Sequence, residues 1–152
     1  MYLMRAESPG PSVGKLTPKV KNTAKILYLI YLVMTVLQMI LLLIGGMPLF
    51  DSLATSFGTA GTGGFGIKND SFTSFSPYIQ WVVTIFMMLF GVNFNVYYLL
   101  SIHKWKEALQ CDEARVYFGI IACSILVITI NIRAMFPTLF DAFHHAAFQV
   151  GT

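Results

Sequence analysis

Three long stretches without charge constrain the fold of this chain more than any other feature of its sequence. Lys, Arg, Asp and Glu are all absent from residues 26–50, 71–102 and 116–132. A helix that crosses the hydrocarbon core of a bilayer needs about 20 mainly apolar residues. The pattern therefore predicts an all-α membrane protein with three transmembrane helices, over about Thr23 to Ile44, Tyr78 to about His103, and Ala114 to just before Pro137.

The overall composition agrees with a membrane protein and excludes several other classes. Only 11% of the 152 residues are charged and 56% are hydrophobic, whereas an ordinary soluble domain carries about 25% charged residues. This composition excludes a soluble enzyme, a nucleic-acid-binding module and a disordered chain. It predicts membrane lipid as a partner and no nucleic acid.

The basic residues predict how the chain lies across the membrane. Five Lys and Arg residues precede Ile26 and three lie between the second and third apolar stretches, whereas the other two loops carry one each, Lys68 and Arg133. Cytoplasmic loops of membrane proteins are enriched in Lys and Arg. The N-terminus and the linker over residues 104–114 are therefore predicted to be cytoplasmic.

The segment between the first two apolar stretches does not read as an ordinary external loop. Residues 51–60 predict a short helix with Asp51 or Ser52 as its N-cap, and four glycines follow within residues 61–66. Ten helical residues cover about 15 Å, half of a hydrocarbon core about 30 Å thick, and five extended residues climb back about 16 Å. The segment is thus predicted to enter the membrane and return, which requires it to be packed in protein or to line a water-filled cavity.

Part of this pattern recurs 90 residues later. Leu49, Phe50 and Asp51 correspond to Leu139, Phe140 and Asp141, and Gly61-Thr62 corresponds to Gly151-Thr152. We expect several units of helix, re-entrant segment and helix in the natural protein. The second copy stops where the first enters its glycine run, which predicts that residues 115–152 are the truncated beginning of a further unit.

The glycine run itself has three interpretations. Its spacing matches the G-x-G-x-x-G dinucleotide motif, but that motif needs a preceding strand and a Rossmann unit. It can be a packing loop whose small residues let helices approach closely. It can also be an ion filter, in which backbone carbonyls replace the hydration shell of a cation and the negative end of the preceding helix favours that cation.

The residues of the run resemble the potassium-channel filter T-V-G-Y-G, with Thr62, Gly63, Gly64, Phe65 and Gly66 in its place. Over essentially its whole length the chain resembles the TrkH/KtrB superfamily of bacterial potassium transporters. The strings that carry this resemblance are Arg5-Ala-Glu-Ser-Pro-Gly-Pro11, Lys15-Leu-Thr-Pro-Lys19, Thr23-Ala-Lys-Ile-Leu27, Leu49-Phe-Asp51, Ala60-Gly-Thr-Gly-Gly-Phe65, Gly91-Val-Asn-Phe-Asn95, Tyr97-Tyr-Leu-Leu100 and Asn131-Ile132.

The resemblance implies four helix–pore loop–helix units around one pore, of which this chain holds a part. Residues 1–22 would be a cytoplasmic lead-in that ends the preceding unit, and residues 23–103 a complete unit with its filter at 62–66. Residues 104–114 would be a cytoplasmic linker, and residues 115–152 the first helix and pore helix of the next unit. The fold would thus hold three transmembrane helices and two short pore helices.

The resemblance also implies the function and the site. Potassium would be taken up across the bacterial plasma (inner) membrane, bound by the carbonyls of Thr62, Gly63, Gly64 and Phe65, and no enzyme activity or resident cofactor is implied. Asp51 and Asp141 are predicted to support the two pore helices, as caps or dipole partners. The full-length protein would form a homodimer and bind a cytosolic nucleotide-binding regulatory subunit.

Two alternatives remain open from the residues alone. The chain can be a subunit of a tetrameric potassium channel, although a homotetramer needs only one pore loop per chain. It can also be a membrane-embedded interaction module without transport, if the glycines only serve packing. Asn93 and Asn95, inside the second apolar stretch, are predicted either to hydrogen-bond between helices or to line a cavity.

Overall fold

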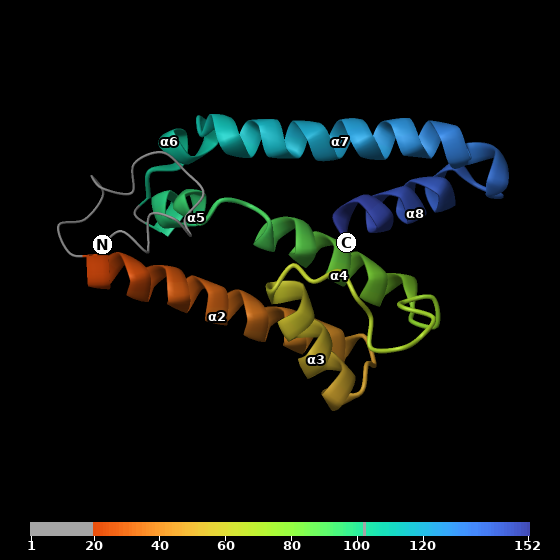
Figure 1. Ribbon diagram of the computed structural model, residues 1–152, viewed down its shortest axis with the longest axis horizontal. Helices are drawn as coiled ribbons and strands as arrows, with labels where there is room; N and C mark the ends of the chain where they lie inside the picture. Colours follow the sequence, from red (N-terminus) through yellow and green to blue (C-terminus); the bar gives the residue numbers. More distant parts are fainter. Residues whose placement is uncertain (1–19, 102) are drawn as a thin grey trace.

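A computed structural model describes residues 20–101 and 103–152, and all the regular elements within these ranges are helical (Figure 1). Most of the predicted lead-in, residues 1–19, lies outside the described residues. The helices are α2 (Val20–Ile44), α3 (Leu49–Ala60), α4 (Pro77–Phe90), α5 (Phe94–Ser101), α6 (Trp105–Leu109), α7 (Asp112–Ile132), the 3-10 turn η2 (Arg133–Met135) and α8 (Leu139–Gly151). The prediction of an all-α protein is confirmed.

Two helices have the length and composition to cross a bilayer. Membrane-length apolar segments cover Ala24–Ile44 in α2 and Asp112–Met135 in α7 with η2. Their helices of 25 and 21 residues extend about 37 Å and 31 Å at 1.5 Å per residue. These lengths match the hydrocarbon core of about 30 Å, as the first and third apolar stretches predict.

The second predicted crossing is interrupted, so its prediction as one helix from Tyr78 to about His103 is wrong. Helix α4 begins with Pro77 after the N-cap Ser76 and ends at Phe90 after 14 residues, which is about 21 Å. Helix α5 adds eight residues after a break at residues 91–93. The break arises where Gly91 leaves room for the hydroxyl of Tyr117, and only the two helices together approach the length of a crossing.

The short helices α3 and α8 turn back beside the long helix that precedes each of them. Figure 1 shows that α3 starts near the end of α2 and α8 near the end of α7, and that both run back toward the middle of the molecule. Helix α8 also packs against α4. Helix α3 corresponds to the short helix predicted over residues 51–60.

The caps of the two short helices differ from the prediction. The N-cap of α3 is Pro48, without a side-chain cap, so neither Asp51 nor Ser52 is the N-cap; proline already holds φ near −65°, and here it is −55°. The N-cap of α8 is Thr138, whose Oγ1 accepts from the Asp141 backbone N–H at 3.1 Å. Asp141 therefore lies in the first turn and is not the cap residue.

Helix α4 lies at the centre of the packing. On one side its residues join α2 and the segment after α3 in a buried cluster that includes Leu42, Phe72, Val83 and Phe86. On the other side, Trp81 and Met88 pack against a second cluster formed by Ile125, Ala146 and Ala147 of α7 and α8. Helix α4 thereby connects the α2–α3 pair with the α7–α8 pair.

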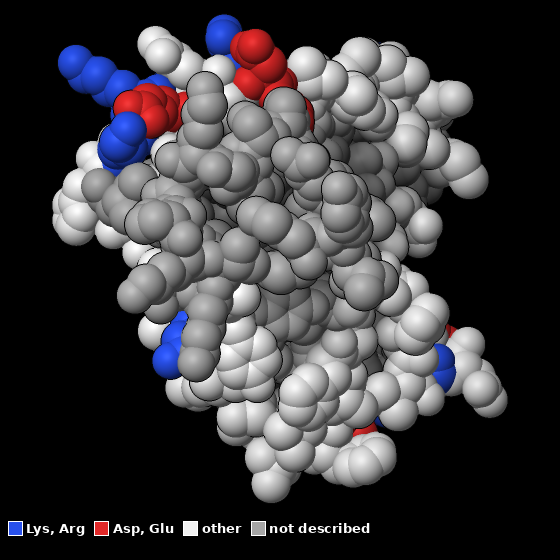
Figure 2. Space-filling view, turned by 60° about the vertical axis from the view of Figure 1, so that its left-hand side comes forward, with Lys and Arg blue, Asp and Glu red and all other residues white. Residues whose placement is uncertain are grey.

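On the face that Figure 2 shows, most of the charged side chains gather at one end. Figure 2 shows acidic and basic atoms together at the top of the view, at the height of α6 and the start of α7, and mostly uncharged atoms over the rest of the described surface on that face. Many large apolar side chains of α2 and α7 are exposed, among them Tyr28, Leu29, Ile120 and Ile130. Such a surface suits contact with lipid or with other helices.

Candidate ion-binding loop

The glycine-rich loop starts directly at the end of α3 and is hydrogen-bonded to it. The backbone N–H groups of Gly61, Thr62 and Gly63 donate to carbonyls of the last α3 turns, over 2.9–3.0 Å. The first loop donors are therefore satisfied by the helix that precedes them. This leaves the negative end of the α3 dipole beside the loop, where it favours positive charge.

Two loop residues have left-handed backbone conformations. Thr62 has φ of 50° and Gly64 has φ of 72°. A non-glycine residue rarely takes positive φ, and the Thr62 hydroxyl donates to the neighbouring Gly61 carbonyl at 2.8 Å. The alternation of left-handed and ordinary residues lets the loop form a tight path that neither a helix nor a strand follows.

The carbonyls of the loop differ from its first N–H groups in their hydrogen bonding. Among the residues that the structure describes, no backbone N–H donates to the carbonyl of Thr62, Gly63, Gly64 or Phe65. The first N–H groups of the loop are bound to α3, so these four carbonyl oxygens are available as acceptors. Carbonyl oxygens in such a loop are the ligands with which ion filters replace the water around a cation.

Gly64 meets the end of the second repeat copy. A Cβ atom placed on Gly64 would lie 2.5 Å from the Thr152 carbonyl oxygen, so a side chain at residue 64 has no space. Thr152 is the counterpart of Thr62 at the offset of 90 residues. The structure therefore brings the glycine-rich loop of the first copy beside the end of the second copy.

The other predicted residues fall in two groups. Gly63, Phe65 and Gly66 belong to the same loop, and the Phe65 ring lies over Gly63 while its side chain is 77% exposed. Asp51 and Asp141 sit in the first turns of α3 and α8, at the ends of these helices away from the loop. The carboxylate of Asp141 accepts from the Thr138 hydroxyl at 2.7 Å, so it supports its helix and does not face an ion in the loop.

Several contacts near the loop have no signal in the sequence. Gly151, just before Thr152, packs closely on Thr84 and Met88 of α4. The Trp81 ring stacks on the His144 ring with centroids 5.1 Å apart, which fixes α8 against α4. These contacts join residues more than 60 positions apart, and no local pattern of spacing or composition announces them.

Comparisons with known proteins agree with this architecture. The family profile described as "TrkH: Cation transport protein" matches residues 1–146. The Trk system potassium uptake protein TrkH of Salmonella typhimurium is 34% identical over 155 residues, which cover 99% of this chain and 32% of that protein. The Trk system potassium uptake protein TrkG of Escherichia coli is 30% identical over 129 residues, covering 84% of this chain and 27% of that protein.

A solved structure is similar in fold as well. The crystal structure of the potassium transporter TrkH from Vibrio parahaemolyticus matches with a TM-score of 0.77 and 27% sequence identity, over 91% of this chain and 31% of that chain. The membrane-length helices and the short helices beside them match this transporter structure, and with the family profile they indicate a helical membrane protein of the transporter class. The chain belongs to the TrkH cation transport family, and this is a family of membrane transporters, not of enzymes. The chain spans about a third of the length of the curated relatives it matches.

Proposed function

We propose that this chain supplies one filter segment, residues 62–66, and the approach to a second one in a four-unit potassium uptake transporter. Potassium would cross the membrane bound in turn by the carbonyls of Thr62, Gly63, Gly64 and Phe65. The names of the relatives and the four carbonyls without a backbone donor among the described residues support this proposal. No resident cofactor takes part, since the potassium ion is the cargo.

The observation that carries the proposal is the contact between Gly64 and Thr152. A filter built from several units of one chain requires their loops to meet around one axis, and a loop that served only packing has no such requirement. The left-handed Gly64 lies against the residue that corresponds to Thr62 in the next copy. This contact favours a shared filter over the packing module.

The orientation and the partners are proposals of the same kind. We place the N-terminal side of α2 and the 104–114 linker in the cytoplasm of a bacterium, and the protein in its inner membrane. The linker and the start of α7 carry charges of both signs, with ion pairs between Lys104 and Glu107 at 2.7 Å and between Arg115 and Asp112 at 3.9 Å. A cytosolic nucleotide-binding regulatory subunit would thus meet a mixed surface, and the full-length protein would form a homodimer.

The test replaces Gly64 with Ser in the full-length gene and measures rubidium uptake and potassium-dependent growth. A serine at a left-handed position costs on the order of 1 kcal/mol, and its Cβ would collide with the Thr152 carbonyl. We expect a lower potassium affinity or weaker discrimination against sodium. Gly58→Ala is the matched control, because a Cβ at residue 58 of α3 meets nothing within 4 Å.

The outcomes separate the alternatives. If Gly64→Ser and Gly58→Ala both leave the ion response unchanged while the protein reaches the membrane in normal amounts, the packing module is favoured. A purified complex in which four copies surround one pore would support the tetrameric channel. The proposal requires one chain to contribute all of the filter segments around each pore.

A further inference from the structure

The break between α4 and α5 leaves helix carbonyls open inside a membrane-spanning segment. The last four C=O groups of any α-helix have no partner within the helix, and the hydrocarbon core offers no water to bind them. Met88 and Leu89 lie in the last turn of α4, directly before the break. The Leu89 carbonyl accepts locally from the Val92 N–H at 3.1 Å, whereas no bond from a backbone N–H at the break to the Met88 carbonyl is found among the described residues. The Met88 carbonyl therefore needs a donor from elsewhere in the protein.

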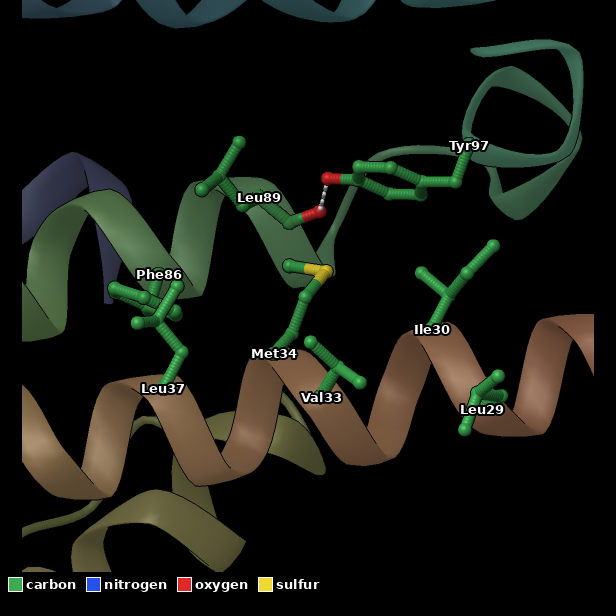
Figure 3. A pocket seen from close by; sticks show the side chains of 8 residues that line it. All are labelled: Leu29, Ile30, Val33, Met34, Leu37, Phe86, Leu89 and Tyr97. Atoms are coloured by element: carbon green, nitrogen blue, oxygen red, sulfur yellow. Dashed lines mark hydrogen bonds between the residues drawn. The ribbon is translucent and has the colours of Figure 1, made fainter. Parts of the chain in front are cut away.

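Two tyrosine hydroxyls donate to these carbonyls: Tyr117 is the donor for Met88, and Tyr97 is an additional donor for Leu89. The Tyr97 hydroxyl of α5 donates to the Leu89 carbonyl at 2.6 Å, as Figure 3 shows, in a wall of an otherwise apolar groove of about 390 Å³. The Tyr117 hydroxyl of α7 donates to the Met88 carbonyl at 3.0 Å, from 29 residues further along the chain. One cap thus comes from the helix that follows the break, and the other from the next long helix.

Gly91 is the residue that lets Tyr117 reach its acceptor. A Cβ atom on Gly91 would overlap the Tyr117 hydroxyl oxygen, and the ring carbon that carries this hydroxyl lies 3.1 Å from the same position. One turn earlier on α7, the Glu113 carboxylate accepts from the Asn93 side-chain amide. Helix α7 therefore contacts the break at two points, one on each side of Val92.

The break also lies near the end of α8, which contacts the candidate ion-binding loop. The terminal methyl group of Met88 would lie 2.9 Å from a Cβ on Gly151, and the carbonyl of the next residue, Thr152, lies against Gly64. The Met88 side chain thus packs on the end of α8, while the Met88 carbonyl accepts from the Tyr117 hydroxyl. The position of the α4 end is therefore tied directly to α7 and α8, and through α8 to the loop.

We propose that Tyr117 is a positioning residue that holds the α4–α5 helix interrupted beside the loop, with Tyr97 as the second cap and Gly91 as the space that Tyr117 requires. Helix α7 thereby determines where α5 leaves the membrane helix of the preceding unit. The proposal concerns the arrangement of helices and does not rest on the proposed potassium filter. Its tests accordingly use structural measurements instead of transport.

The first test is a double-mutant cycle on the full-length protein in detergent, read as the melting temperature. Gly91→Ala should lower the Tm, because the new methyl group displaces Tyr117. Tyr117→Phe removes the oxygen that the methyl group meets, so the Tm loss caused by Gly91→Ala should fall by about half or more in the Tyr117→Phe background, as expected for residues in contact. Gly119→Ala on α7 is the control, because a Cβ there meets nothing within 4 Å, and its effect should be the same in both backgrounds. Additive losses for Gly91→Ala and Tyr117→Phe would overturn the proposal.

The second test uses only the mild variant Tyr117→Phe. It therefore remains informative even if the protein with Gly91→Ala does not fold. Loss of one hydrogen bond should speed amide hydrogen exchange at the break, where the Val92 N–H donates to the Leu89 carbonyl, by about 2- to 10-fold. Tyr28→Phe, at an exposed tyrosine of α2, should leave exchange at the break unchanged. Equal exchange in the Tyr117→Phe variant and the parent protein would contradict the role of Tyr117.

Discussion

The α2–α3 pair and the α7–α8 pair have the same plan but differ in what covers their short helices. Helices α3 and α8 begin at Leu49 and Leu139, 90 residues apart. In both, the residue three positions later faces the protein, since Ser52 and Ala142 are both 0% exposed. Each short helix therefore packs on its own long helix in the same register.

The α2–α3 pair and the α7–α8 pair differ about one and a half helical turns further along their short helices. Phe57 of α3 is 66% exposed, whereas its counterpart Ala147 of α8 is 2% exposed. Ala147 belongs to the cluster that α8 forms with Trp81 and Met88 of α4, whereas Phe57 stays largely exposed although α3 also packs against α4. The shared register thus comes from the repeat itself, and the difference comes from the contact between one unit and the next.

Exchanging the residue types at positions 57 and 147 should give the largest difference in melting temperature between the two pairs. Ala147→Phe inserts a ring into the closed contact between α8 and α4, and overpacking of this kind costs about 1–3 kcal/mol or more. Phe57→Ala removes a ring that is exposed in this chain and should change the stability of the chain by less than about 1 kcal/mol. The measurement is the Tm of purified variants of this 152-residue chain. A Phe57→Ala loss as large as that of Ala147→Phe would show that α3 is covered as tightly as α8.

A smaller difference in melting temperature should follow from the carboxylates in the first turns of α3 and α8. Asp51 and Asp141 both lie in a first helical turn, where a carboxylate stabilises the helix by about 0.3–1 kcal/mol. Only Asp141 also accepts from a threonine hydroxyl, that of Thr138, and such a bond adds about 0.5–1.5 kcal/mol. Asp141→Ala should therefore lower the Tm more than Asp51→Ala. Equal losses would show that the Thr138 contact contributes nothing to stability.

Much of this fold follows from local patterns in the sequence. The charge-free stretches place α2 and α7, and Pro77 after Ser76 places the start of α4. Glycine and proline separate α2 from α3, because Gly45, Gly46 and Pro48 do not continue a helix. These signals act within a few residues, so they can be read without knowing what the helix packs against.

The features that the sequence did not reveal depend on distant contacts. The break after α4 has no clear local signal, because Gly91 and Asn93 are both tolerated inside membrane helices. The hydroxyls that bond to its open end belong to Tyr97 and Tyr117, further along the chain. The N-cap of α3 was assigned to Asp51 or Ser52 by residue type, although Pro48 already starts the helix. The glycine run was found from composition, but its contact with Thr152 depends on how α8 packs against α4.

The most direct measurement of the central claim is anomalous diffraction from crystals of the full-length protein grown in rubidium, a heavier stand-in for potassium. The account predicts an anomalous peak at coordination distance from the carbonyls of Thr62, Gly63, Gly64 and Phe65, beside the loop of the next unit. Gly64 packed against lipid acyl chains, with the rubidium peak located elsewhere in the protein, would contradict it.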